Sequence, residues 1–151
     1  MRALLQRVQR ASVAIEGNVT SEIGPGFVIL LGVRKGDSEA DARFLAGKCA
    51  SLRVMEDSGG KMNLSLLEAE GSALIVSQFT LYADTRRGNR PGFSDAAGST
   101  EAEPLYDAFV VAMKQALGET RVRTGLFGAM MRVTIVNDGP VTILVESNVQ
   151  Q

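Results

Sequence analysis

The segment "MMRVTIVNDGPVTILVES", residues 130–147, decides the fold because two strand-like runs flank the four residues NDGP. Valine, isoleucine and threonine dominate both runs, and these β-branched residues are typical of strands. Asparagine, aspartate, glycine and proline are typical of tight turns. The local pattern therefore predicts a hairpin turn, with Pro140 opening an edge strand because proline cannot donate to a sheet ladder.

The segments before it add further strands. Strand patterns in residues 3–33 are interrupted by two glycine-containing turns. Residues 27–33 are apolar on both faces, so they predict a buried strand. Residues 73–83, "ALIVSQFTLYA", predict a second buried strand with polar side chains on one side near its end. These polar side chains belong to Gln78, Thr80 and Tyr82.

Two other segments have helical spacing. Residues 38–53 predict a helix that begins with Ser38 and Asp41 as a capping signal. Its expected apolar side consists of Phe44, Leu45, Cys49 and Leu52. The second helix has apolar residues at every fourth position, namely Leu105, Phe109, Met113 and Leu117. Pro104 is expected in or near its first turn, and Gly118 is a natural stop.

Strands dominate this order of elements, and only two helices interrupt them. The regular alternation of a doubly wound parallel sheet is missing, so the sequence predicts an α+β fold with a mainly antiparallel sheet. A chain of 151 residues suits one hydrophobic core. We therefore expect a single domain over residues 1–151.

The composition limits the chemistry. The chain has no histidine, which removes Ser-His-Asp and Cys-His catalysis and the usual histidine-containing zinc sites. Proton transfer must then use carboxylates, lysine, hydroxyls, water or the substrate itself. The single cysteine, Cys49, fits a packing role better than a nucleophilic one.

Charge and hydropathy limit the partners. The net charge is −1, so a broad basic surface for nucleic acid is missing and any RNA contact must be local. No apolar run approaches the roughly 18 residues of a membrane span. The cytoplasm is therefore the expected compartment.

A long loop rich in glycine, proline and arginine covers residues 84–104, and loops of this length are usually functional. Its arginines either face solvent or contact phosphate, since the guanidinium fork matches phosphate oxygens. These arginines are Arg86, Arg87 and Arg90. Phe93 either packs over a ligand or anchors the loop. Thr80 has no evident base that would make it a nucleophile.

Several segments together resemble the D-aminoacyl-tRNA deacylase family. They occur in the family's order over nearly the whole chain, and "SQFTL" and "NDGPVT" are its two signature motifs. The other matching elements are "QRV", "LLGVRKGD", "GGKMNLSL", "GNRP", "FSDAA" and "TGLFGAMM".

The resemblance implies hydrolysis of the ester that joins a D-amino acid to the 3′ end of tRNA, with glycyl-tRNA as a further substrate. It implies a cytoplasmic homodimer of compact, β-rich, barrel-like subunits with two symmetry-related active sites. No metal or organic cofactor is expected, and neither DNA nor a membrane is an expected partner. In this family the 2′-hydroxyl of the terminal adenosine is thought to assist the attacking water, which fits the missing histidine.

The resemblance also implies residue roles. The catalytic residues around the adenosine and aminoacyl group are Ser77, Gln78, Phe79 and Thr80, with Phe79 as a backbone donor. The residues for substrate binding and chiral rejection are Arg7, Phe93, Asn137, Gly139 and Pro140. The candidate tRNA contacts are Arg86, Arg87 and Arg90.

The implied chirality screen is a cis Gly139–Pro140 pair that Arg7 holds in place and that enters the opposite subunit's active site. Backbone carbonyls that crowd the position of an L side chain would reject L residues. D residues and glycine have a hydrogen at that position and would be accepted.

Two other hypotheses stay open. One is a non-catalytic RNA-binding or nucleotide-binding dimer that uses the arginine loop, although the near-neutral charge counts against it. The other is a hydrolase of small esters with Thr80 as nucleophile, for which Thr80→Ala should abolish activity. Comparing the deacylation of D-, L- and glycyl-tRNA separates the three hypotheses.

Overall fold

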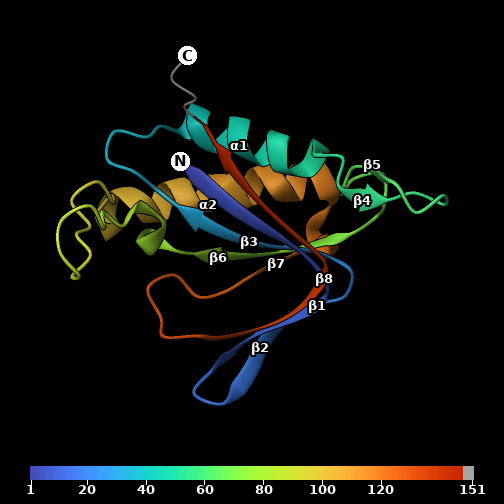
Figure 1. Cartoon of the computed structure of the whole chain (residues 1–151), viewed down its shortest axis with the longest axis horizontal. Helices are drawn as coiled ribbons and strands as arrows, with labels where there is room; N and C mark the ends of the chain where they lie inside the picture. Colours follow the sequence, from blue (N-terminus) through green and yellow to red (C-terminus); the bar gives the residue numbers. More distant parts are fainter. Residues whose placement is uncertain (148–151) are drawn as a thin grey trace.

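The computed structural model describes residues 1–147, which form a curved sheet with two long helices on one side (Figure 1). The main sheet consists of β1 (Arg2–Ile15), β2 (Asn18–Ile23), β3 (Gly26–Gly32), β6 (Ser72–Ser77), β7 (Val122–Thr124) and β8 (Arg132–Glu146). A separate hairpin consists of β4 (Met55–Glu56) and β5 (Met62–Leu64). The helices are α1 (Glu39–Ser51) and α2 (Ser99–Leu117), and the short 3₁₀ helices are η1 (Phe79–Tyr82) and η2 (Glu119–Arg121).

β1 organises the sheet because it is long enough to have three partners. It pairs antiparallel with β3 through residues 2–8 and with β2 through residues 11–15, and β8 runs antiparallel along its other edge. β6 is parallel to both β3 and β7. Ser21 Oγ donates a 2.6 Å hydrogen bond to the Thr124 carbonyl, which brings β2 beside β7. The prediction of an α+β fold with a mainly antiparallel sheet is confirmed, and the two parallel pairings are additional to it.

β3 lies between two layers of apolar side chains. Phe27 and Ile29 face the helices, whereas Val28 packs on the opposite side with Leu74. Burying a side chain of this size contributes roughly 1.5–3 kcal/mol to folding. The prediction that residues 27–33 form a buried strand is confirmed, because β3 is apolar on both faces and is covered on both.

α1 begins where the sequence predicts. The Ser38 side chain accepts from the Asp41 backbone N–H, and the Asp41 carboxylate accepts from the Ser38 N–H at 2.8 Å. The Ser38 hydroxyl also lowers the pKa of Asp41 below its usual value. The expected apolar side is wrong at Phe44, which is 56% exposed because it lies about 100° around the helix from Leu45. The buried side consists of Ala42, Leu45, Ala46, Cys49 and Ala50.

The packing of Cys49 predicts slow thiol chemistry. The side chain is fully buried, and desolvation raises the pKa of its thiol to about 12. Because the thiolate is the reactive form, we expect negligible reaction with a disulfide reagent at pH 8 in the native protein and rapid reaction in urea. Absorbance of the released thiol measures both rates. Equal rates in the two conditions would contradict this burial.

α2 begins earlier than the sequence suggests. It starts at Ser99, so Pro104, which was expected in or near the first turn, lies just after that turn as the sixth residue of the helix. Proline at this position removes the hydrogen bond to the Thr100 carbonyl. Thr100 and Pro104 are both exposed, so water can satisfy that carbonyl. The helix ends at Leu117, with Gly118 as its C-cap, as predicted.

The NDGP segment does not form a hairpin. β8 continues through it, and both halves of β8 run antiparallel to β1, with Gln6 opposite Thr142 and Val8 opposite Asn137. Residues 138–141 therefore lie opposite the single residue Arg7. The prediction of a chain reversal is wrong because pairing with β1 on both sides outweighs the local turn preference, and the turn residues form a bulge instead.

Candidate active site

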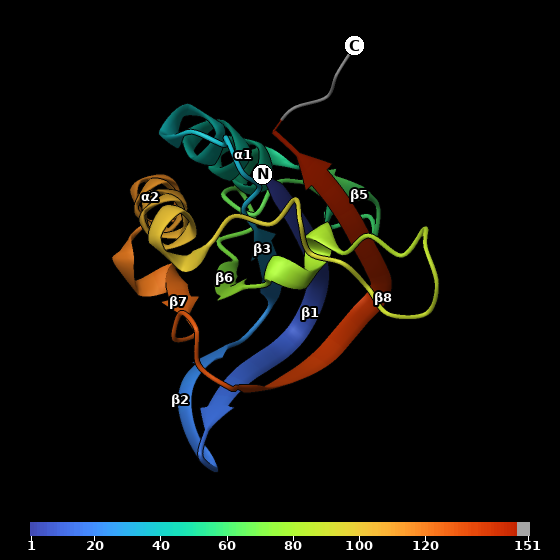
Figure 2. The same ribbon diagram turned by 90° about the vertical axis from the view of Figure 1, so that its left-hand side faces the viewer.

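The candidate site begins where β6 ends. The Gln78 N–H still donates to the Leu31 carbonyl of β3 at 2.8 Å, but the chain then turns into η1 (Figure 2). The sequence places Gln78, Thr80 and Tyr82 on one side of a strand, and this prediction is wrong. The 3₁₀ turn rotates successive side chains apart, so that Thr80 is exposed whereas Tyr82 is buried.

A cavity of 560 Å³ lies beside this strand end. Its walls come from the end of β6, the start of α2 and the loop before β8. The lining residues are Val33, Val76, Ser77, Gln78, Phe79, Ala97, Gly98, Ser99, Ala102, Phe127, Gly128, Ala129, Met130, Met131 and Val133. No residue in this lining is ionisable, within the described part of the chain. A mainly apolar cavity with a few polar groups is typical of a small-ligand site.

The polar groups at the cavity are donors rather than bases. Within residues 1–147, the backbone N–H groups of Phe79 and Thr80 have no hydrogen-bond partner, since they open η1 without a side-chain cap. The Gln78 side-chain amide donates to the Thr80 hydroxyl. Two adjacent free N–H groups can stabilise negative charge on an oxygen that accepts hydrogen bonds from both. Free backbone N–H groups are the kind of donor that an oxyanion site uses.

An aromatic pair borders the cavity. The rings of Phe79 and Phe93 make an edge-to-face contact with centroids 5.1 Å apart. Phe93 comes from the arginine-rich loop, whose base is closed by two hydrogen bonds of 2.7 and 2.9 Å between the backbones of Asp84 and Gly92. The structure thus brings Phe93 to the strand end, although it lies 14 positions after Phe79 in the sequence. Both rings remain partly exposed, so they can pack against a ligand.

The three loop arginines lie outside the cavity lining. Arg86 forms a fork with the Asp84 carboxylate at 2.8 Å for both nitrogens, and these hydrogen bonds hold the pKa of that carboxyl well below its usual range. Arg86 is therefore already engaged within the loop. Arg87 and Arg90 are exposed. Neither forms a hydrogen bond or an ion pair with another residue in the described range 1–147.

Arg7 meets the bulge in β8. Its side chain is only 4% exposed, and its Nε donates to the Asp138 carbonyl at 3.2 Å. Gly139 has a φ of +125°, which favours glycine, and the Gly139–Pro140 peptide bond is cis. Gly139, Pro140 and Asn137 are exposed and do not line the 560 Å³ cavity of the same chain. The structure thus joins Arg7 to the NDGP segment but leaves this segment outside the cavity.

The opposite wall of the cavity is not predicted from the sequence. Phe127 and residues 128–131 line it, and Met130 is 91% exposed at its edge. The segment "TGLFGAMM" contributes to the family resemblance, but no role follows from it in the sequence. The feature that could have indicated this wall is the combination of two glycines with large apolar side chains between strands. This combination is unusual for a solvent-exposed loop.

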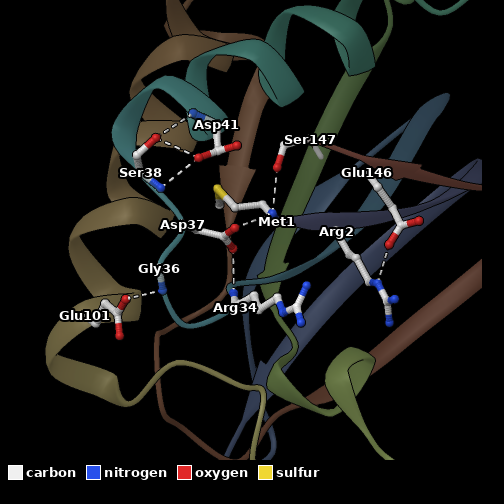
Figure 3. Close-up of polar contacts among 10 residues, drawn as sticks. All are labelled: Met1, Arg2, Arg34, Gly36, Asp37, Ser38, Asp41, Glu101, Glu146 and Ser147. Atoms are coloured by element: carbon white, nitrogen blue, oxygen red, sulfur yellow. Dashed lines mark hydrogen bonds and ion pairs between the residues drawn. The ribbon is translucent and has the colours of Figure 1, made fainter. Parts of the chain in front are cut away.

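A network of polar contacts links the N-terminus, the segment before α1, the end of β8 and the start of α2 (Figure 3). The amino group of Met1 lies 2.9 Å from the Asp37 carboxylate and donates to Ser147 Oγ at 2.7 Å. Asp37 also accepts from the Arg34 N–H at 2.6 Å. The Gly36 N–H donates to Glu101 in the first turn of α2 at 2.9 Å. The Gly36–Glu101 hydrogen bond ties this network to the start of α2, which forms one wall of the cavity.

A second cavity, of 330 Å³, borders this network. Its cationic groups are each paired with an acid, as Arg2 with Glu146 at 2.5 Å and Arg34 with Asp95 at 3.5 Å. Its charges therefore satisfy one another, and we place the candidate site in the mainly apolar cavity of 560 Å³. Within residues 1–147 there is no group of three or more Cys, Asp or Glu residues that could hold a metal ion. No helix among them is long and apolar enough to cross a membrane.

Comparisons with known proteins identify the family. The family model described as D-Tyr-tRNA(Tyr) deacylase matches residues 4–146. The D-aminoacyl-tRNA deacylase of Roseiflexus sp. (strain RS-1) is 58% identical over 97% of this chain and 94% of its own length. That of Thermomicrobium roseum is 57% identical over the same shares.

Two solved structures resemble the fold. A structure named c-Myc DNA Unwinding Element Binding Protein has a TM-score of 0.94 and 39% identity, over 99% of this chain and 100% of that one. A structure described as a probable eukaryotic D-amino acid tRNA deacylase has a TM-score of 0.83 over 96% of this chain and 98% of that one. At 19% identity, the latter shows the fold alone.

The family match and the close relatives place the chain among the deacylases, enzymes that hydrolyse an acyl bond. More specifically, the chain belongs to the D-aminoacyl-tRNA deacylase family. The resemblance seen in the sequence and the prediction of an enzyme of this family are confirmed. This membership favours an enzyme over the alternative of a non-catalytic RNA-binding dimer.

Proposed function

We propose that this protein hydrolyses the ester of D-aminoacyl-tRNA and of glycyl-tRNA, that it rejects L-aminoacyl-tRNA, and that the tRNA's own 2′-hydroxyl assists the reaction. The observation that carries the proposal is a cavity without an ionisable side chain beside two free backbone N–H groups. Such a site offers oxyanion stabilisation but no protein base. The base must then come from the substrate or from water.

In the proposed reaction, the ester carbonyl oxygen faces the N–H groups of Phe79 and Thr80. A water oxygen bonds to the carbonyl carbon, the bond from that carbon to the 3′-oxygen breaks, and the water's proton ends on the 3′-oxygen. The 2′-hydroxyl orients this water and relays its proton. The terminal adenosine packs against Phe79 and Phe93, and Ser77 and Gln78 orient it through hydrogen bonds. Orientation of this kind lowers the barrier without a charged catalyst.

We assign the rejection of L residues to Gly139 and Pro140 of a second subunit. In support, this pair is exposed, lies outside the cavity of its own chain and is held from behind by Arg7. Its carbonyl groups would occupy the space of an L side chain in the partner's cavity, with Asn137 beside them. A homodimer with two such shared sites follows from this assignment.

The remaining contacts concern the tRNA body. Arg87 and Arg90 are free for phosphate, and Arg86 would add to them if Asp84 released it. Because the proposed reaction uses a 2′-hydroxyl, the substrate is RNA and not DNA. We expect the protein to act where tRNA is charged, in the cytoplasm.

Replacing the 2′-hydroxyl of the terminal adenosine with hydrogen tests the mechanism. We expect turnover of the D-aminoacyl ester to fall by at least about a hundredfold, since general acid–base assistance is usually worth that much. Single-turnover deacylation of matched 2′-hydroxyl and 2′-deoxy substrates measures the effect. Equal rates would contradict substrate assistance.

Thr80→Ala separates this mechanism from a protein nucleophile. The substitution keeps the backbone N–H that the proposal uses, so we expect most of the activity to remain. Complete loss of activity in a folded variant would instead support Thr80 as the nucleophile.

A further inference from the structure

The hairpin β4–β5 is held rigid by one carboxylate. Asp57 accepts from the N–H groups of Gly59 and Lys61 at 2.9 and 3.0 Å, and from the Asn63 side-chain amide at 3.2 Å. The hydrogen bond from the Lys61 backbone is the main reason that the pKa of Asp57 lies below its usual value. Arg53 fixes the other side, because its Nε donates to the Asn63 carbonyl at 2.7 Å. The hairpin therefore has a defined shape although it projects from the body of the fold (Figure 1).

Arg7 connects this hairpin to the NDGP segment. One terminal nitrogen donates to the Val54 carbonyl at 2.8 Å, and the other lies 3.4 Å from the Glu56 carboxylate. On the opposite side, Nε donates to the Asp138 carbonyl and lies 3.4 Å from the Asp138 carboxylate. The guanidinium thus bridges two segments of chain that are 82 residues apart, counting from Glu56 to Asp138.

The Arg7 side chain takes the place of the regular pairing with β1 that residues 138–141 lack. Residues 138–141 bulge away from β1, so the regular ladder does not fix Gly139 and Pro140. Arg7 supplies the fixed point, but an arginine with partners on one side alone would keep much of its rotamer freedom. Val54 and Glu56 occupy the other nitrogens of its planar fork and remove that freedom.

We infer that the β4–β5 hairpin is a positioning element for the chirality screen, with Glu56 and Asp57 as positioning residues that act through Arg7 on Gly139 and Pro140. This inference rests on the proposed function and adds specificity determinants to it. Within the described residues, no residue of the hairpin lines the 560 Å³ cavity. Its effect is to keep the screening carbonyls at one position, so that an L side chain meets them and a D residue does not.

The two residues should differ in the size of their effect. Glu56 is 56% exposed and its contact with Arg7 is long, so Glu56→Ala should lower the ratio of kcat/KM for D- over L-aminoacyl-tRNA by about two- to fivefold. Glu56→Gln keeps an oxygen acceptor and should recover most of that loss. Asp57→Ala removes three hydrogen bonds that shape the hairpin, and we expect the ratio to fall by about tenfold.

Both enantiomers are tested on the same tRNA, with kcat and KM determined separately. Glu103→Ala is the matched control, since it also removes one exposed glutamate and Glu103 has no ion pair with another described residue. A purely structural loss would lower the melting temperature and both rates together and would leave the D-to-L ratio unchanged. A positioning role predicts a lower ratio of kcat/KM for the D over the L substrate, with the KM for the D substrate unchanged.

The outcomes separate the inference from the proposed function. A wild-type protein without preference for the D substrate would overturn both. A wild-type preference that persists unchanged in Glu56→Ala and Asp57→Ala would overturn the role of the hairpin alone. If Asp57→Ala fails to fold, the comparison of Glu56→Ala with Glu56→Gln tests the role of the hairpin. Both of these substitutions change a mainly exposed side chain, so both variants should fold.

Discussion

Gly139→Ala is expected to reduce deacylation of D-aminoacyl-tRNA by about a hundredfold, since a displacement of about 1 Å near a reacting group has this effect. A Cβ added to Gly139 would lie 2.9 Å from the Val141 backbone nitrogen and 3.3 Å from an Arg7 nitrogen. The backbone φ of +125° adds strain for any L side chain. The bulge must therefore move, and its carbonyl groups would leave the position proposed for the screen.

The matched control is Gly17→Ala. Gly17 also has a positive φ, but a Cβ there meets nothing within 4 Å, so strain occurs without a clash. We expect wild-type deacylation from this variant. Wild-type rates and intact L rejection in Gly139→Ala would contradict the proposed screen.

Mixing subunits tests where the screen acts. Gly139→Ala carries an intact cavity, and Phe79→Ala carries an intact Gly139–Pro140 pair. Phe79→Ala removes the ring proposed to pack against the adenosine, so we expect both variants to be impaired. If the pair serves the partner's cavity, random mixing of the two impaired variants should restore about a quarter of the sites in a two-fold dimer. An absence of recovery in verified mixed dimers would place the screen within one chain.

Arg7→Ala should have the second largest effect, on both stability and selectivity. The Val54 and Asp138 carbonyl groups would lose a charged donor in a partly buried position. Leaving such acceptors unpaired costs roughly 1–3 kcal/mol for each group, so we expect the free energy of unfolding to fall by about 3 kcal/mol. The bulge would also lose its fixed point, and the D-to-L ratio should fall further than in Glu56→Ala.

Urea unfolding measures the stability of this variant, and the two deacylation rates measure its selectivity. Arg7→Lys serves as the comparison, because a single ammonium can reach one carbonyl but lacks the planar fork that joins both segments. We expect it to retain more stability than Arg7→Ala and to discriminate poorly. Unchanged stability and selectivity in Arg7→Ala would contradict the bridging role.

Local signals predicted the elements whose structure is decided locally. The Ser38 and Asp41 pattern marks the start of α1, and the two-faced apolar run of residues 27–33 becomes the buried strand β3. Gly118 likewise ends α2. Capping and side-chain periodicity act within a few residues, so a single sequence is enough to reveal them.

The wrong predictions concern positions where contacts with other parts of the fold determine the local structure. The NDGP segment has turn chemistry, but its pairing with β1 makes it a bulge inside one long strand. The segment 73–83 has strand chemistry, but the ladder with β3 ends at Ser77 and the chain turns into η1 at the cavity. Phe44 follows the helical spacing only approximately, and the packing of alanines selects a different face.

The site could be predicted in part. Ser77, Gln78 and Phe79 line the cavity, whereas Thr80 is not among its lining residues; their roles toward a substrate stay predictions. The contact between Phe79 and Phe93 and the wall formed by residues 127–131 depend on the folded loops. The bridge from Arg7 to Val54 and Asp138 is equally non-local, since it joins three segments that are far apart in the sequence.

Deacylation of one tRNA, charged in turn with a D-amino acid, its L enantiomer and glycine, tests the central claim most directly. The wild-type protein should hydrolyse the D and glycyl esters, and it should hydrolyse the L ester more slowly by about a hundredfold or more, because a steric clash in a preformed site is the basis of discrimination. A blank without protein corrects for spontaneous hydrolysis of each ester. Equal rates for the D and L esters would contradict chirality screening by this protein.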